Sequence, residues 1–176
     1  MLETAVFGGG CFWCTEAIFK RLKGVKSVVP GYTGGATSDP DYEKVAGGAT
    51  GHAESIKIEF DPSLITYDDL LAVFFNTHDP TTLNRQGSDV GTQYRSAVFY
   101  ADDEQRTKAE ALIRELNGAH AYDKPVVTDI VPLGPFYEAE SYHRDYYDSH
   151  ADQPYCQIVI APKLEKLQKR FAGLLA

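Results

Sequence analysis

The order of strand-like and helix-like segments in the first hundred residues most constrains the fold. Short apolar or alternating runs, typical of strands, are separated by two runs with apolar residues at helical spacing. We expect strands at 4–7, 25–29, 55–60 and 95–100, and helices at 11–22 and 67–76, with Thr66 as the cap of the second helix. This strand-helix-strand-strand-helix-strand order is that of the ferredoxin-like split βαβ motif, an antiparallel or mixed sheet with helices packed on it. The sequence therefore predicts an α+β fold.

Further segments follow this core as a C-terminal extension. Helices are expected at 102–116, 138–150 and 162–174, and strands at 126–131 and 157–160. Two long stretches, 30–51 and 78–92, are polar and rich in turn-forming residues, and loops of that length are usually functional. Because 176 residues is the usual size of one domain, we expect 1–176 to form a single domain.

The charge and hydropathy patterns exclude several partners. The chain has 17 Lys and Arg against 25 Asp and Glu, for a net charge of −8, and a negative body repels phosphate backbones. No apolar run approaches the roughly 18–20 residues that a membrane helix needs. The first 19 residues contain no Lys or Arg, unlike a secretory signal peptide. We expect a cytoplasmic monomer that binds neither nucleic acid nor membranes.

The three cysteines are too few, and odd in number, for a secreted disulfide scaffold. Cys11 follows three glycines and is expected at the start of a helix, where free amides and the helix dipole lower the pKa of a thiol. A thiol of that kind is a nucleophile near neutral pH. Cys14 lies three residues further, on the same helical face.

Other interpretations of this cysteine pair remain open from the residues alone. The two side chains could be buried as small hydrophobes. A zinc site would need two more ligands, and the chain has no second C-x-x-C motif, so we predict no metal. A general dithiol–disulfide exchange site is the stronger alternative, although Phe12 and Trp13 make a bulky insertion between the cysteines. These two aromatic residues either line an apolar pocket or belong to the core.

The sequence around Cys11 resembles the active-site signature of the type A peptide methionine sulfoxide reductases. The similarity continues, in the same order, along nearly the whole chain. The matching residues are Gly10-Cys11-Phe12-Trp13, Gly31-Tyr32-Thr33-Gly34-Gly35, Tyr42, Thr50-Gly51-His52-Ala53-Glu54, the run from His78 to Gly87, Asp89, Gly91, Gln93-Tyr94-Arg95-Ser96, Phe136, Ala139-Glu140 and Tyr142-His143. The resemblance implies thiol-dependent reduction of the S epimer of methionine sulfoxide, free and in oxidised proteins and peptides, as protein repair.

Attack of a thiolate on the sulfoxide sulfur requires a proton donor, because the oxygen leaves poorly unless it is protonated. The resemblance implies that Cys11 is the nucleophile and that Glu54 donates the proton. A carboxyl group does so near pH 7 only if burial raises its pKa. The resemblance also implies that the hydroxyls of Tyr42 and Tyr94 hydrogen-bond the substrate oxygen.

The resemblance assigns four further residues to the substrate site. Phe12 and Trp13 correspond to the apolar pocket for the substrate methyl group. Asp89 corresponds to an aspartate that contacts the substrate backbone or orders the site. His143 corresponds to a histidine near the active site, without a role that the sequence defines.

After the attack, Cys11 carries a sulfenic acid that a second thiol must reduce. Many family members hold this resolving cysteine in a glycine-rich C-terminal tail, whereas here Cys156 is followed by the strand expected at 157–160. Cys14 stands where many members have glycine. We expect Cys14 to resolve the sulfenic acid, with Cys156 and an external thiol as alternatives. Thioredoxin or a similar dithiol carrier is the expected reductant, with no bound cofactor; a general dithiol–disulfide oxidoreductase remains the alternative function.

Overall fold

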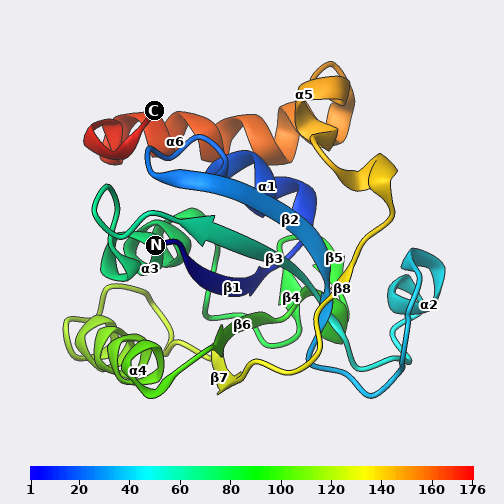
Figure 1. Ribbon diagram of the computed structural model, residues 1–176, viewed down its shortest axis with the longest axis horizontal. Coiled ribbons are helices and arrows are strands. Elements are labelled where there is room, and N and C mark those ends of the chain that lie inside the picture. Colours follow the sequence, from blue (N-terminus) through cyan, green and yellow to red (C-terminus); the bar gives the residue numbers. More distant parts are fainter.

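A six-stranded sheet forms the centre of the computed structural model, which describes residues 1–176 (Figure 1). The strands lie in the order β7-β6-β1-β3-β2-β8. Their bounds are β1 (Glu3–Gly9), β2 (Val25–Thr33), β3 (Ala53–Phe60), β6 (Ser96–Tyr100), β7 (Asp129–Pro132) and β8 (Tyr137–Glu138). Strand β7 pairs with β6 in parallel, and every other pair in this sheet is antiparallel. The prediction of an α+β protein is confirmed, and the order of the four central strands is compatible with the split βαβ motif.

Four longer helices accompany the sheet: α1 (Phe12–Phe19), α3 (Tyr67–Thr77), α4 (Asp103–Gly118) and α6 (Ala161–Arg170). The shorter elements are α2 (Tyr42–Ala46), α5 (Tyr146–His150), a hairpin of β4 (Arg85–Gln86) and β5 (Asp89–Val90), three 3₁₀ turns at Thr92–Tyr94, Ser141–His143 and Ala172–Leu174, and a π-helix at Cys156–Ile160. Helix α3 begins at the expected cap, since the Thr66 side chain accepts from the Asp69 amide and Asp69 accepts from the Thr66 amide.

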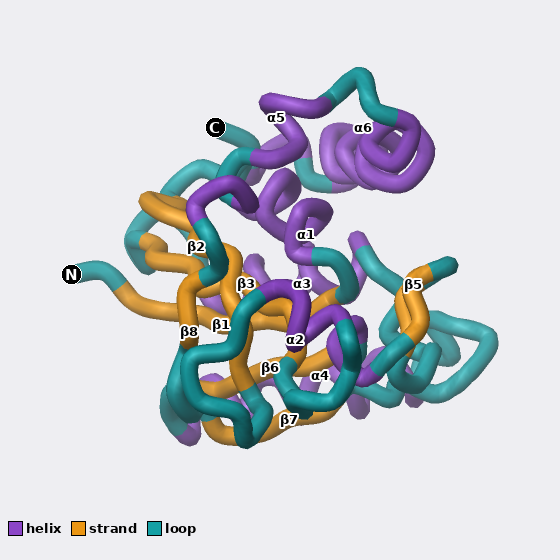
Figure 2. Tube along the Cα trace, turned by 90° about the vertical axis from the view of Figure 1, so that its right-hand side faces the viewer, coloured by secondary structure: helices purple, strands orange, loops and turns teal.

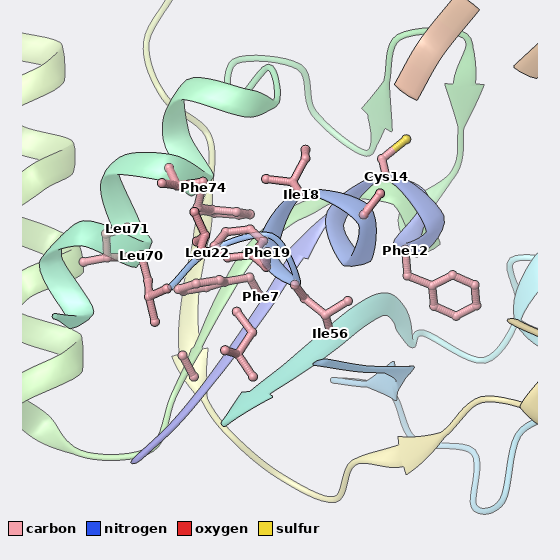
Figure 3. Packing of buried hydrophobic residues seen from close by; sticks show 14 of the residues in the cluster. Phe7, Phe12, Cys14, Ile18, Phe19, Leu22, Ile56, Leu70, Leu71 and Phe74 are labelled. Atoms are coloured by element: carbon pink, nitrogen blue, oxygen red, sulfur yellow. The ribbon is translucent and has the colours of Figure 1, made fainter. Parts of the chain in front are cut away.

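The core lies between the sheet and the helices. In β1, Ala5 and Phe7 face this core, whereas Val6 faces the opposite side of the sheet, as the period of two along a strand requires. Phe7 stacks on Phe74 of α3, with ring centroids 4.7 Å apart, and also contacts Phe19 of α1 (Figure 3). This packing anchors α1 on the sheet, and with it the cysteines at its amino end.

Two expected elements of the C-terminal extension are wrong. The run 157–160 is not a strand but part of the π-helix, which follows Tyr155 directly and continues into α6. A short apolar run fits a buried helix as well as a strand, and here Cys156 and Ile160 face the core. The segment 138–150 is not one helix: it contains the end of β8, a 3₁₀ turn and α5. Both segments border the cysteines, so the correction changes the surroundings of Cys14 and Cys156.

Candidate active site

Cys11 lies at the junction between β1 and α1, where it is the N-cap residue of the helix. Gly10 makes the turn possible: its φ is +91°, and an added Cβ would lie 2.7 Å from the Gln86 side chain of the β4–β5 hairpin. Only glycine adopts this conformation without strain and leaves room for the hairpin. Figure 2 shows this side of the molecule, with α2, β5 and α5 around α1.

Glu54 lies near the start of β3, and its side chain is 1% exposed. Its Oε1 accepts a hydrogen bond of 3.2 Å from the backbone N–H of Phe12, the residue after Cys11. Burial raises the pKa of Glu54 to about 8; the Phe12 amide opposes the rise, and the charges of Asp89 and Cys14 add to it. Glu54 thus meets the condition for a proton donor near pH 7, a buried carboxyl group with a raised pKa. At neutral pH this carboxyl group carries a proton, as a general acid requires.

The expected low pKa of Cys11 is wrong for the substrate-free protein. Burial raises the pKa of the Cys11 thiol well above its ordinary value, and the neighbouring Cys14 thiol and the charge of Glu54 raise it further. The Trp13 amide acts in the opposite direction, but it does not outweigh the loss of water. The helix amide of Phe12 serves Glu54 instead of the sulfur. The neighbouring Cys11 thiol in turn lowers the pKa of Cys14.

Aromatic rings from four elements meet beside Cys11. His143 lies 5.0 Å from Phe12 and 4.6 Å from Tyr42, measured between ring centroids. Its Nδ1 accepts a 3.0 Å hydrogen bond from Nε1 of Trp13, and because indole is only a donor, the proton of a neutral His143 sits on Nε2. Burial lowers the pKa of His143, and Nε2 is buried without a partner. Trp13 also stacks on Tyr146 at 3.7 Å, so its ring is held from two sides.

Tyr42 and Tyr94 approach the same place from α2 and from the 3₁₀ turn before β6. Burial, followed by the charge of Glu54, raises the pKa of both phenols, to about 12 for Tyr42. Both therefore stay protonated and can donate a hydrogen bond to an oxygen. Glu140 holds the start of α2: its Oε2 accepts from the Tyr42 amide at 3.0 Å and its Oε1 from the Tyr32 hydroxyl at 2.9 Å. Sequence reasoning assigned Glu140 no role, although it lies within a matching motif.

Asp89 lies in β5 and is connected with Cys14 through the side chain of Tyr155. Its Oδ2 accepts a hydrogen bond of 2.9 Å from the Tyr155 hydroxyl, which also lies 3.9 Å from Sγ of Cys14. Sequence reasoning missed Tyr155, because no spacing along the chain connects residue 155 with residue 14. The contact depends on how the helix that carries Tyr155 packs on α1.

All three cysteines are free, and Cys14 and Cys156 are buried. Cys156 opens the π-helix and is 0% exposed. Burial raises the pKa of its thiol, and the charge of Cys14 raises it further. The thiol of Cys14 thus lies close enough to Cys11 to shift its pKa, whereas Cys156 is fully enclosed in the core.

The structure contains no group of three or more His, Cys, Asp or Glu side chains that could hold a metal ion. None of its helices combines the length and apolar character needed to cross a membrane.

Comparisons with known proteins agree with the geometry. A family profile described as peptide methionine sulfoxide reductase matches residues 3–174. The protein named peptide methionine sulfoxide reductase MsrA of Sulfolobus acidocaldarius is 56% identical over 170 residues, which cover 97% of this chain and 96% of that protein. An MsrA of Thermus thermophilus is 55% identical over 173 residues, which cover 98% of this chain and 97% of that protein.

Solved structures share the fold. Reduced Mxr1 from Saccharomyces cerevisiae superposes with a TM-score of 0.80 at 32% identity, covering 88% of this chain and 89% of the other. Methionine sulfoxide reductase A of Corynebacterium diphtheriae gives 0.76 at 34% identity, covering 85% and 76%. Mxr1 in complex with Trx2 matches with a TM-score of 0.57 at 22% identity, covering 82% of this chain and 84% of that one. Agreement along nearly the whole chain places this protein in the MsrA family of peptide methionine sulfoxide reductases, enzymes that reduce methionine sulfoxide to methionine.

Proposed function

We propose that Cys11 attacks the sulfoxide sulfur while Glu54 protonates the oxygen. The observation that carries this proposal is the neutral carboxyl of Glu54, with a pKa of about 8, which is hydrogen-bonded to the amide of the residue after Cys11. In the substrate-free protein, Cys11 holds its proton. As Glu54 transfers its own proton to the substrate oxygen, Cys11 gives its proton to the carboxylate that Glu54 leaves, and a bond forms between the Cys11 sulfur and the substrate sulfur. This bond then breaks while the hydroxyl group passes from the substrate sulfur to Cys11, so methionine leaves and Cys11 carries a sulfenic acid.

The neighbouring side chains orient the substrate in this proposal. The phenols of Tyr42 and Tyr94 donate hydrogen bonds to the sulfoxide oxygen, for which their raised pKa values suit them. Phe12 and Trp13 surround the methyl group, and His143 keeps the Trp13 ring in place through its Nδ1. Because the site fixes the positions of the oxygen and the methyl group around the substrate sulfur, it distinguishes the two epimers. We propose that the S epimer is the substrate, both free and in oxidised proteins.

We propose that the carboxylate of Asp89 contacts the backbone of the bound substrate. We also propose that Cys14 resolves the sulfenic acid, because its thiol lies close enough to that of Cys11 for each to shift the pKa of the other. A disulfide needs Cβ atoms about 3.5–4.5 Å apart, so Cys11 and Cys14 must approach to that distance when the bond forms. Cys156 is the second candidate, and it must leave its buried position to react.

We propose that a thioredoxin-like dithiol reduces the Cys11–Cys14 bond, without any bound cofactor. The complex of Mxr1 with Trx2 supports this choice. Free cysteines and a dithiol reductant suit the cytoplasm, where thiols are kept reduced. We propose that 1–176 acts as a single catalytic domain and as a monomer; its larger hydrophobic cluster contains residues from β1 through to α6.

The first test uses resolved S and R epimers of methionine sulfoxide with excess dithiothreitol. We expect the wild-type protein to release methionine from the S epimer only, and Cys11→Ser to release none. Turnover of the R epimer, or activity of Cys11→Ser, would contradict the proposal. Cys14→Ser separates it from the alternative: a general dithiol exchanger loses all chemistry, whereas a reductase still releases one methionine per Cys11 in a single turnover.

A further inference from the structure

The hydroxyl of Tyr155 lies between the thiol of Cys14 and the carboxylate of Asp89. Its oxygen is 3.9 Å from Cys14 Sγ and 2.9 Å from Asp89 Oδ2. Three elements far apart in the sequence supply these groups: α1, the β4–β5 hairpin, and the start of the C-terminal helical segment. Cys14 is 2% exposed, so water has little access to its sulfur.

The direction of the hydrogen bonds follows from the number of protons. A tyrosine hydroxyl has one hydrogen, and Tyr155 donates it to Asp89. The lone pairs of the same oxygen then face Cys14, so the thiol of Cys14 is the donor in that contact. The chain of bonds runs in one direction, from the Cys14 S–H through the Tyr155 O–H to the Asp89 carboxylate.

Resolution of the sulfenic acid requires a proton to leave Cys14. The sulfur of Cys14 attacks the sulfur of Cys11, the S–S bond forms and the S–OH bond breaks. The hydroxyl group must gain one proton to leave as water, and Cys14 must lose one. Overall, one thiol and one sulfenic acid give one disulfide and one water, with no external oxidant or reductant.

We propose that Tyr155 is a catalytic residue for this second step: its hydroxyl takes the proton from Cys14 while passing its own proton to Asp89. Asp89 returns the proton to the departing hydroxyl group, directly or through Tyr155, and the relay is reset. The inference rests on the proposed role of Cys14. Tyr155 suits a neutral relay because burial, followed by the charges of Cys11 and Cys14, raises the pKa of its phenol far above the ordinary value.

The surroundings hold Tyr155 in this position. Its ring meets Trp13 edge-on at 6.0 Å, and its backbone is helical where the π-helix begins. π-Helical turns inside longer helices occur frequently at functional sites. The ring thus keeps its place when only the hydroxyl is removed, and Tyr155→Phe isolates the proton transfer.

The test measures the two chemical steps separately in a single turnover with the S epimer and no external reductant. Methionine release reports the Cys11 step, and loss of free thiols with mapping of the Cys11–Cys14 bond reports the second step. For Tyr155→Phe we expect methionine release at the wild-type rate and disulfide formation slower by about tenfold or more, within the usual range for general acid–base catalysis. Tyr122→Phe is the matched control, since its hydroxyl bonds the Phe75 carbonyl, away from the cysteines.

The pH dependence separates a relay from a packing role. Without the relay, Cys14 loses its proton to solvent, so disulfide formation in Tyr155→Phe should rise with pH more steeply than in the wild type. Equal rates of disulfide formation in both proteins would overturn the relay alone. A parallel loss of methionine release would assign Tyr155 to packing of Trp13. If no Cys11–Cys14 bond forms in the wild type, the role of Cys14 fails, and the relay fails with it.

Discussion

Replacing Glu54 with glutamine should inactivate the enzyme and stabilise the protein. The carboxyl has a pKa of about 8 when folded against an ordinary value of 4.5, because burial disfavours its charge. Between these values the folded state binds a proton that the unfolded state has lost. Burial of Glu54 therefore leaves the free energy of unfolding unaffected below pH 4.5 and lowers it increasingly as the pH rises towards 8. Each pH unit in this window costs the folded state about 1.4 kcal/mol.

At pH 7, about 2.5 units above the ordinary value, Glu54 therefore costs the protein about 3 kcal/mol, and above pH 8 about 5 kcal/mol. Glutamine never ionises, has nearly the same shape, and its amide oxygen can still accept from the Phe12 amide. We expect Glu54→Gln to be more stable than the wild type by up to these amounts, with a difference that falls to about 1 kcal/mol or less at pH 5. The rate of methionine formation should fall about 10²–10⁴-fold, as for loss of a general acid.

Urea unfolding at pH 5, 7 and 8.5 measures the stability difference, and single-turnover methionine release measures the activity. Glu59→Gln, on the same strand and in a less buried position, controls for the general effect of removing a negative charge. A stability difference that stays constant with pH would refute the idea that burial of Glu54 holds its proton. Full activity of the variant would refute its role as the acid.

Three further predictions concern single side chains. His143→Phe leaves the indole N–H of Trp13 without its acceptor, at a cost of about 1–3 kcal/mol, and should raise KM more than it lowers kcat in steady-state assays. Gly10→Ala should destabilise the protein in urea more than Gly87→Ala, because both have positive φ but only Gly10 has a close neighbour, Gln86. Cys156→Ser should lower Tm, since it places a hydroxyl in an apolar core, and retain turnover with thioredoxin as the reductant; loss of that turnover, with single-turnover methionine release unchanged, would make Cys156 the resolving thiol.

The fold and the site were predictable from the sequence to different extents. Period-two and helical patterns located the four central strands, α1 and α3, and the cap at Thr66 marked where α3 starts. The strand predicted at 157–160 was wrong, because a few apolar β-branched residues pack equally well in a strand or a buried helix. Motif residues located Cys11 and Glu54, since their chemistry depends on residue type and order.

The sequence by itself determined the α+β class, the family resemblance and the residues proposed for the sulfoxide chemistry, because local periodicity and motif order are written along the chain. Only the tertiary structure decided the protonation of the site and the surroundings of Cys14. The pKa of Cys11 depends on how much water the fold removes, which outweighs the helix amides that the sequence indicates. The contact from Cys14 through Tyr155 to Asp89 joins residues far apart in the chain, and only the packing of their elements sets such distances.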